Sequence, residues 1–110
     1  MPLGLRGESN KMDKRKIVRT YSAGVFFGEL VENSRSSDGK RGIIKNARRL
    51  FYWVGASSLS QLAVDGVCTP GKCKFPVSVP NIEVTEIIEI LDVTKKAAKS
   101  IDGVQVWKQV

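Results

Sequence analysis

Near the middle of the chain stands the stretch Asn46-Ala47-Arg48-Arg49-Leu50-Phe51-Tyr52-Trp53. Its last six positions hold two arginines and three aromatic residues. A guanidinium group binds phosphate through a planar fork of donors, and an aromatic ring offers a base a stacking surface. Such a stretch needs either an anionic partner or an interior that satisfies both cations. It also sets the fold, because it reads as the end of a strand that leads into a helix.

Strand geometry separates the two arginines. Successive side chains of a strand point to opposite faces, so Arg48 lies on one face and Arg49 on the other. Phe51 and Trp53 follow the face of Arg49. We therefore expect only one of the two arginines to reach a given ligand, while the other meets solvent, an acidic partner or a second subunit. Arg19, on the neighbouring predicted strand, is expected to converge with one of them.

A short helix is predicted directly after this strand, over residues 57–65. Ser58 and Gln61 have the spacing of a capping box, and Gly66 fits the left-handed position that ends a helix. The free amides and the positive dipole end of a helix attract phosphate. We therefore expect Ser57 and Ser58 to lie beside the arginines in a ligand site.

The other elements are predicted from β-branched residues, glycines and caps. Residues 17–21 and 25–31 form one long strand or two strands broken at Gly24, and residues 33–42 form a polar loop. Further predicted elements are a return strand over 42–53, a strand with a register shift over 82–93, a helix over 95–102 that Thr94 caps and Gly103 stops, and an edge strand over 104–108. The fold class is therefore α+β, a mainly antiparallel twisted sheet of about five strands with two short helices, and the sheet can be strongly curved or form a small barrel.

The 110 residues, 42% of them hydrophobic, suffice for one domain with its own core. Residues 1–16 lack apolar periodicity and end in a basic cluster. We predict a flexible basic arm over residues 1–16 and a single α+β domain over residues 17–110.

The net charge of +7 lies entirely in the first half of the chain. Residues 1–55 carry 12 Lys and Arg against 5 Asp and Glu, whereas residues 56–110 carry 6 of each kind. This asymmetry suggests an anionic partner. A protein that merely carries a basic tail is the simpler alternative.

The residue inventory argues against catalysis. The chain has no histidine, so neither a Ser-His nor a Cys-His nucleophile can be assembled. Cys68 and Cys73 would supply only half of a structural zinc site, and we interpret them as free thiols that flank a turn. No apolar run approaches the ~20 residues that cross a bilayer. We expect a cytoplasmic protein that is not an enzyme and holds neither metal nor cofactor.

Other residues complete the predicted ligand site. Ser22 and Gly24 can present a hydroxyl and amides to an anion, as a backbone nest does, although a bulge that only bends the sheet also explains Gly24. Tyr52, Trp53 or Phe75 can stack on a base. Packing in the core is the alternative for Trp53 and Phe75.

Several motifs carry a resemblance over about residues 17–108. They are Arg19-Thr20-Tyr21-Ser22-Ala23-Gly24-Val25, Asn46-Ala47-Arg48-Arg49, Tyr52-Trp53 and Ser58-Leu59-Ser60-Gln61-Leu62-Ala63. Together they resemble a family of small phage and prophage proteins of unknown function. The chain is also similar to the phage Thoeris anti-defence sponge, which sequesters cyclic ADP-ribose signals.

This resemblance implies an oligomer that binds a nucleotide messenger tightly without cleaving it. It also implies that Arg19 and Arg48 hold phosphate. The base-contacting residues of the sponges have only approximate counterparts in Phe75 and Asn81, so another cyclic nucleotide is an open alternative.

The sequence thus predicts a phage-encoded immune-evasion protein of the host cell cytoplasm. It would bind and sequester a cyclic nucleotide signal, a cyclic ADP-ribose isomer or a cyclic oligonucleotide, at the subunit boundaries of a homo-oligomer. Two alternatives stay open: a nucleic-acid-binding accessory protein that uses the basic arm, and a host-protein-binding module in which Arg48 and Arg49 form interface ion pairs.

Overall fold

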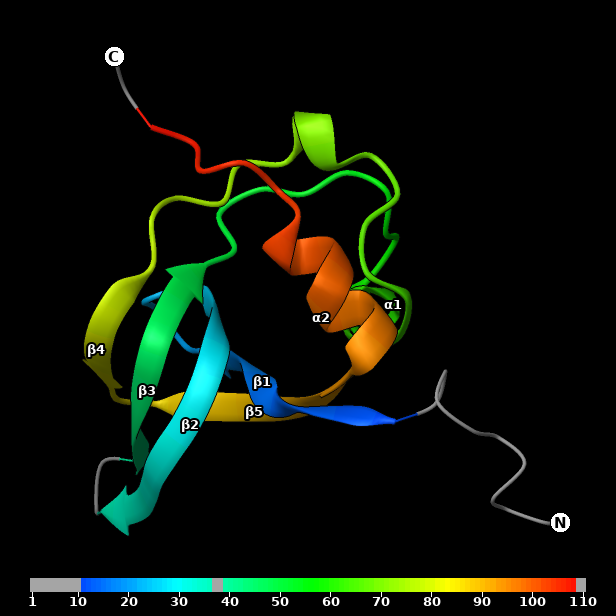
Figure 1. The fold of residues 1–110 in the computed structure, drawn as a ribbon. Coiled ribbons are helices and arrows are strands. Elements are labelled where there is room, and N and C mark those ends of the chain that lie inside the picture. Colours follow the sequence, from blue (N-terminus) through cyan, green and yellow to red (C-terminus); the bar gives the residue numbers. More distant parts are fainter. Residues whose placement is uncertain (1–10, 37–38, 109–110) are drawn as a thin grey trace, which may run out of the picture.

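The computed structural model describes residues 11–36 and 39–108, which form five strands and two short α-helices (Figure 1). The elements are β1 (Met12–Thr20), β2 (Val25–Ser36), β3 (Gly39–Arg49), α1 (Leu59–Asp65), the 3₁₀ turn η3 (Pro70–Lys72), β4 (Val79–Val84), β5 (Ile87–Thr94) and α2 (Lys95–Asp102). The predicted α+β class with a mainly antiparallel sheet is confirmed. No helix in this part of the chain combines the length and the apolar character needed to cross a bilayer.

The sheet is strongly bent. Its order is β4-β3-β2-β1-β5, and every neighbouring pair is antiparallel. β4 and β5 therefore lie at opposite edges, although only Thr85 and Glu86 separate them in the chain. The two edges can be that close only if the sheet curls, and Figure 1 shows β2 and β3 running across β1 and β5. Register shifts in the β1–β5 and β2–β3 pairs add local twist.

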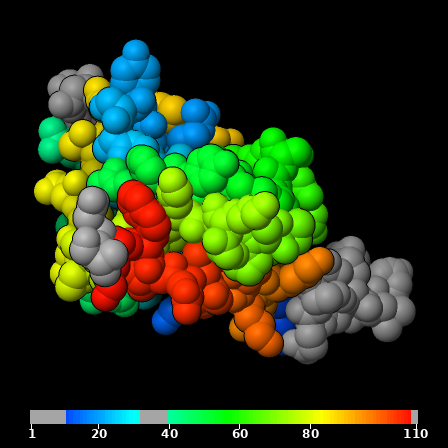
Figure 2. All heavy atoms as spheres, turned by 90° about the horizontal axis from the view of Figure 1, so that it is seen from above, coloured from blue at the N-terminus to red at the C-terminus, as the bar shows by residue number. Residues whose placement is uncertain are grey.

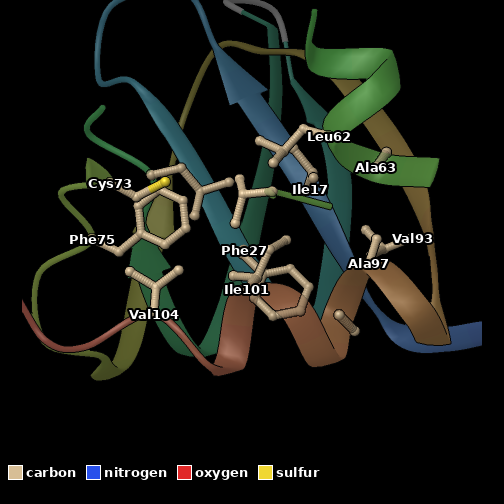
Figure 3. Packing of buried hydrophobic residues seen from close by; sticks show 13 residues of the cluster. Ile17, Phe27, Leu62, Ala63, Cys73, Phe75, Val93, Ala97, Ile101 and Val104 are labelled. Carbon is tan, nitrogen blue, oxygen red and sulfur yellow. The ribbon is translucent and has the colours of Figure 1, made fainter. Parts of the chain in front are cut away.

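Each face of the sheet carries its own hydrophobic cluster. Neighbouring residues such as Phe26 and Phe27 point to opposite faces and join different clusters. The smaller cluster draws residues from all five strands, which fits a sheet that curls over this face: Val18, Phe26, Ile44, Ala47, Val84 and Ile87. The larger cluster lies between the sheet and the helices and includes Ile17, Phe27, Phe75 and Ile101 (Figure 3).

Both predicted helix starts are confirmed. The Ser58 side chain accepts a hydrogen bond from the Gln61 amide, and the helix ends at Gly66, whose φ is 78°. The Thr94 side chain accepts from the Ala97 amide at 3.0 Å. The Thr94 hydroxyl also donates to the Val64 carbonyl at 2.7 Å, so one side chain joins the start of α2 to the end of α1.

The first predicted boundary is wrong. Residues 12–16 belong to β1 and not to a flexible arm; residues 1–10 of that arm lie outside the described residues. This strand lacks apolar alternation because ion pairs hold its charged side chains. Arg15 lies over the Phe27 ring and forms hydrogen bonds of 2.8 and 2.9 Å with the Asp102 carboxylate of α2. The sequence at the start of β1 therefore resembles that of a solvated tail.

Other strand predictions also need correction. The predicted loop over 33–42 consists largely of β2 and β3, whose backbones pair as far as Ser36 and Gly39. The predicted strand over 82–93 is two strands separated by a corner where Glu86 has a positive φ of 57°. The return strand ends at Arg49, and the predicted edge strand over 104–108 contains only one isolated bridge, between Val106 and Phe75. The chain divides into two strands at Gly24, one of the two options predicted.

Because the curled sheet is tightly packed at Gly28, a single methyl group added there should lower the stability of the fold. A Cβ on Gly28 would lie 2.6 Å from the Ile44 side chain and 2.8 Å from the Lys45 carbonyl oxygen. We expect Gly28→Ala to lower the free energy of unfolding by about 1–3 kcal/mol, the usual cost of overpacking. Urea denaturation measures this change. Gly71→Ala is the matched control, since nothing lies within 4 Å of its added Cβ, and an equal loss in both variants would contradict the predicted packing.

Candidate functional site

Arg48 and Arg49 lie on opposite faces of β3, as strand alternation predicts. Arg48 lies over the ring of Phe75 in the larger cluster, whereas Arg49 lies over the ring of Phe26 in the smaller one. The two guanidinium groups therefore cannot act on one ligand atom.

Arg48 is an interior residue with only 8% of its surface exposed. Its Nε donates to the Pro76 carbonyl at 3.1 Å and its Nη1 to the Ile101 carbonyl at 3.1 Å. Its Nη2 donates to the carbonyls of Phe75 at 3.1 Å and Val104 at 2.7 Å. The prediction of Arg48 as a phosphate clamp is therefore corrected, because main-chain acceptors already occupy its donor fork.

Burial lowers the pKa of the Arg48 guanidinium, and the nearby carboxylate of Asp102 opposes that shift. The group stays charged at neutral pH, since an arginine side chain is not deprotonated in proteins. Arg48 thus keeps its positive charge inside the molecule, and its hydrogen-bond partners are neutral carbonyl groups.

Phe75 cannot stack on a ligand. Its side chain is fully buried in the larger cluster, beside Cys73 and Val104 (Figure 3). This corrects its predicted role as a base clamp in favour of the core alternative. Cys73 is a free, buried thiol, and Cys68 is a free, exposed one.

Arg19 and Tyr52 do not line a groove with Arg49. The Nε of Arg19 donates to Glu89 Oε1 on β5 at 2.8 Å, so the two side chains form an ion pair. Tyr52 forms a two-bond backbone bridge with Lys74, whose Nζ lies 5.6 Å from the centre of the tyrosine ring. Neither residue contributes to the groove described below.

Side chains at the start of α1 form hydrogen bonds with one another and with nearby main-chain amides. Gln61 Oε1 accepts from both the amide and the hydroxyl of Ser57 at 2.9 Å, while Ser58 caps the Gln61 amide. The helix has only 7 residues, so its dipole is short. The predicted phosphate contact of Ser57 is corrected, because its amide and hydroxyl are engaged, and neither Ser57 nor Ser58 lines the groove of Arg49.

Four predicted residues meet in one groove: Ser22, Gly24, Arg49 and Trp53. The groove has a volume of about 490 Å³ and is completed by Ala23, Val25, Leu50 and Phe51. One side is the turn between β1 and β2, and the other is the segment that follows β3. Figure 2 shows the blue-to-cyan turn beside the green segment, and a hydrogen bond of 2.8 Å from the Leu50 amide to the Val25 carbonyl joins them.

Two contacts hold the Arg49 side chain in place. Its Nη1 donates to the Ala23 carbonyl, and its guanidinium carbon lies 4.5 Å from the centre of the Phe26 ring. Arginine has five N–H donors. Within residues 11–36 and 39–108, the donors of Arg49 other than this one on Nη1 have no hydrogen-bond partner. The side chain is thus pre-positioned with donors left for a ligand.

The turn opposite Arg49 is fixed by Thr20. The Thr20 hydroxyl donates to the Gly24 carbonyl at 2.8 Å and accepts from the Ala23 amide at 3.0 Å. Gly24 has a φ of +103°, and a Cβ there would lie 3.3 Å from Arg49 Nη1. Glycine is therefore required both for the backbone conformation and for the close approach of the guanidinium. The Ser22 hydroxyl donates to Glu86 at 3.3 Å.

Phe51 is the aromatic residue of the groove that the sequence-based site lacks. Its ring is 60% exposed and stacks on Trp107 with centroids 5.5 Å apart and planes 8° apart. Trp53, by contrast, is half-buried and packs against the larger cluster. The sequence signal for Phe51 was its place in the alternation of Arg49, Phe51 and Trp53. All three residues line the groove, although the strand itself ends at Arg49.

The groove combines one arginine with donors to spare, an exposed aromatic ring, an apolar wall and a turn that carries a serine hydroxyl. This arrangement can bind an anionic group and a flat ring together. The chain has no histidine, and the only carboxylate that contacts a groove residue is Glu86, through Ser22, among the described residues.

A family described as a domain of unknown function (DUF6948) has a model that matches residues 13–101. The matched range includes the β1–β2 turn and residues 49–53, so it contains the whole groove. No curated protein and no solved structure matches the chain. The family description states neither an activity nor a ligand.

The different surroundings of the two arginines predict different mutational costs. Arg48→Met would leave the Pro76 and Val104 carbonyls without their donor, and we expect it to lower the free energy of unfolding by about 2–4 kcal/mol. Arg49→Met loses only one hydrogen bond and a contact with an aromatic ring, which together cost about 1 kcal/mol or less. Urea denaturation of both variants checks this. A larger loss in Arg49→Met would contradict the assignment of Arg48 to the interior.

Proposed function

We propose that this chain, which belongs to the DUF6948 family, is a binding protein without catalytic turnover whose groove takes a small phosphorylated ligand. The first candidate is a cyclic nucleotide signal, either a cyclic ADP-ribose isomer or a cyclic oligonucleotide. The observation that carries the proposal is Arg49, held by Ala23 and Phe26 with unused donors beside the exposed ring of Phe51.

Three properties of the groove support a nucleotide over a simple anion. Its volume of about 490 Å³ lies within the range of about 300–1,000 Å³ that is usual for small-molecule sites. Arg49 can pair with a phosphate group through its remaining donors. Phe51 offers a stacking face for a base, and its stacked partner Trp107 holds the ring in place.

We propose immune evasion as the biological role, with the protein encoded by a phage and acting in the host cell cytoplasm. Support comes from the resemblance of its motifs to small phage proteins and to the Thoeris anti-defence sponge. A sponge acts by stoichiometric capture, so it needs a high affinity and no reaction chemistry. The donors of Arg49 and the exposed ring of Phe51 support such a capture role.

A homo-oligomer is part of this proposal. The groove lies open where Phe51 is 60% exposed, and the neighbouring Trp107 is 43% exposed. A second copy that covers these rings would close the groove and shield the phosphate contact from water, which strengthens it.

A calorimetric titration with cyclic dinucleotides, cyclic ADP-ribose isomers and their linear counterparts tests the proposal. We expect at least one cyclic compound to bind with micromolar or tighter affinity. Arg49→Ala should weaken that binding by about tenfold to a hundredfold, the value of a charge-assisted hydrogen bond. Arg19→Ala is the control, because it removes the same charge from an ion pair outside the groove.

The proposal fails if no compound binds to correctly folded protein, or if both variants lose affinity equally. Single-stranded and duplex nucleic acids form the comparison arm, since the basic first half attracts any polyanion. Affinity that falls steeply with salt, is unaffected by Arg49→Ala and is lost on deletion of residues 1–10 would favour a nucleic-acid-binding protein instead.

A further inference from the structure

A second cavity lies on the Arg48 side of β3 and shares no lining residue with the groove. Its volume is about 280 Å³. The charged side chains of its wall are Lys14, Arg15, Lys45, Arg48, Glu29 and Asp102. Four are cations and two are anions, so the wall carries a net charge of +2.

Both carboxylates of the wall already have cationic partners. Arg15 Nη1 and Nη2 donate to the two oxygens of Asp102 at 2.8 and 2.9 Å. The hydrogen bonds of Arg15 to Asp13, and then those to Asp102, raise its pKa above the ordinary value. Glu29 lies 3.9 Å from Lys14 Nζ.

The other two cations of the wall have no carboxylate in contact. Arg48 is 8% exposed and hydrogen-bonded only to neutral carbonyls. Lys45 has no ion pair or hydrogen bond from its side chain within the described ranges 11–36 and 39–108. The Asp102 carboxylate acts on the buried Arg48 charge but is already paired with Arg15, and Lys45 is exposed, so a further anion beside these two cations is favoured.

A β-bulge brings these two cations to the same cavity. Phe27 pairs with Arg48, whereas Glu29 pairs with Lys45, so β3 contains one extra residue at this point. Asn46 takes up that residue with a positive φ of 51°. Regular alternation would place Lys45 and Arg48 on opposite faces, and a bulge re-aims side chains in this way.

The bulge also supplies neutral donors. The Asn46 amide and the Ser78 hydroxyl line the cavity, and neither side chain has a hydrogen-bond partner in the part of the chain that the structure describes. Amide and hydroxyl groups complete the oxygen contacts of a bound phosphate when lysines provide the charge.

We propose that this cavity is a binding site for a single phosphate group, carried either by inorganic phosphate or by a phosphomonoester. The net charge of its wall matches a dianion, and its volume has room for one phosphate group. The site does not depend on Arg49 or on the groove.

An NMR titration of the isotope-labelled full chain with inorganic phosphate, at constant ionic strength, tests the proposal. We expect saturable shifts of the amide signals near Asn46 and Ser78. Lys14→Ala/Lys45→Ala should weaken the binding about tenfold or more. Lys72→Ala/Lys96→Ala removes the same charge elsewhere on the surface and should leave the affinity unchanged.

The proposal is overturned if chloride reproduces the shifts, if nothing saturates, or if both double variants weaken binding equally, since diffuse surface charge would then explain the result. Arg49→Ala must retain phosphate binding; its loss would place the phosphate in the groove and overturn the assignment. Glycerol phosphate in a parallel titration separates the two sources: tighter binding than inorganic phosphate identifies a phosphomonoester, and equal binding identifies the free ion.

Discussion

The hydrogen bonds from Arg48 to four main-chain carbonyls join β3 to two segments outside the sheet. Their acceptors come from the segment before β4 and from the end of α2 with the residue beyond Gly103. Without Arg48 the Pro76 and Val104 carbonyls would lose their donor, at a cost of about 1–3 kcal/mol each. The Phe75 and Ile101 carbonyls would keep the main-chain amides of Trp107 and Val104. The guanidinium also covers the ring of Phe75. The interior therefore demands an arginine at this position of β3.

Because alternation turns the next side chain to the other face, the same strand presents Arg49 to the surface. Arg48 thus serves the interior, and we propose recognition as the role of Arg49. Around Arg49 the surroundings are a carbonyl, a ring and a glycine turn, which suit a phosphorylated ring compound. Beside Arg48 lies a polar cavity whose wall includes lysine, asparagine and serine side chains, and we propose a phosphate group as its ligand.

Sequence reasoning succeeds here where the signal is local. The caps at Ser58 and Thr94, the break at Gly24 and the opposite faces of Arg48 and Arg49 all follow from a few neighbouring residues. It fails where a distant contact decides. The start of β1 looks like a solvated tail because its Arg15 is held by Asp102, 87 residues away. The burial of Phe75 and the acceptors of Arg48 likewise depend on segments that meet only in the folded chain, and the bulge at Asn46 has no local sequence signature.

The central claim is that the Arg49 groove captures a phosphorylated ligand and returns it unchanged. Its most direct test is mass spectrometry of the ligand released by denaturation, after the chain has been incubated with a cyclic nucleotide and freed of unbound material. The account predicts the intact cyclic compound from the wild-type chain and none from Arg49→Ala. Recovery of a linear or hydrolysed product from the wild type would show turnover, and equal recovery from both proteins would show that the ligand is held elsewhere; either result would contradict the account.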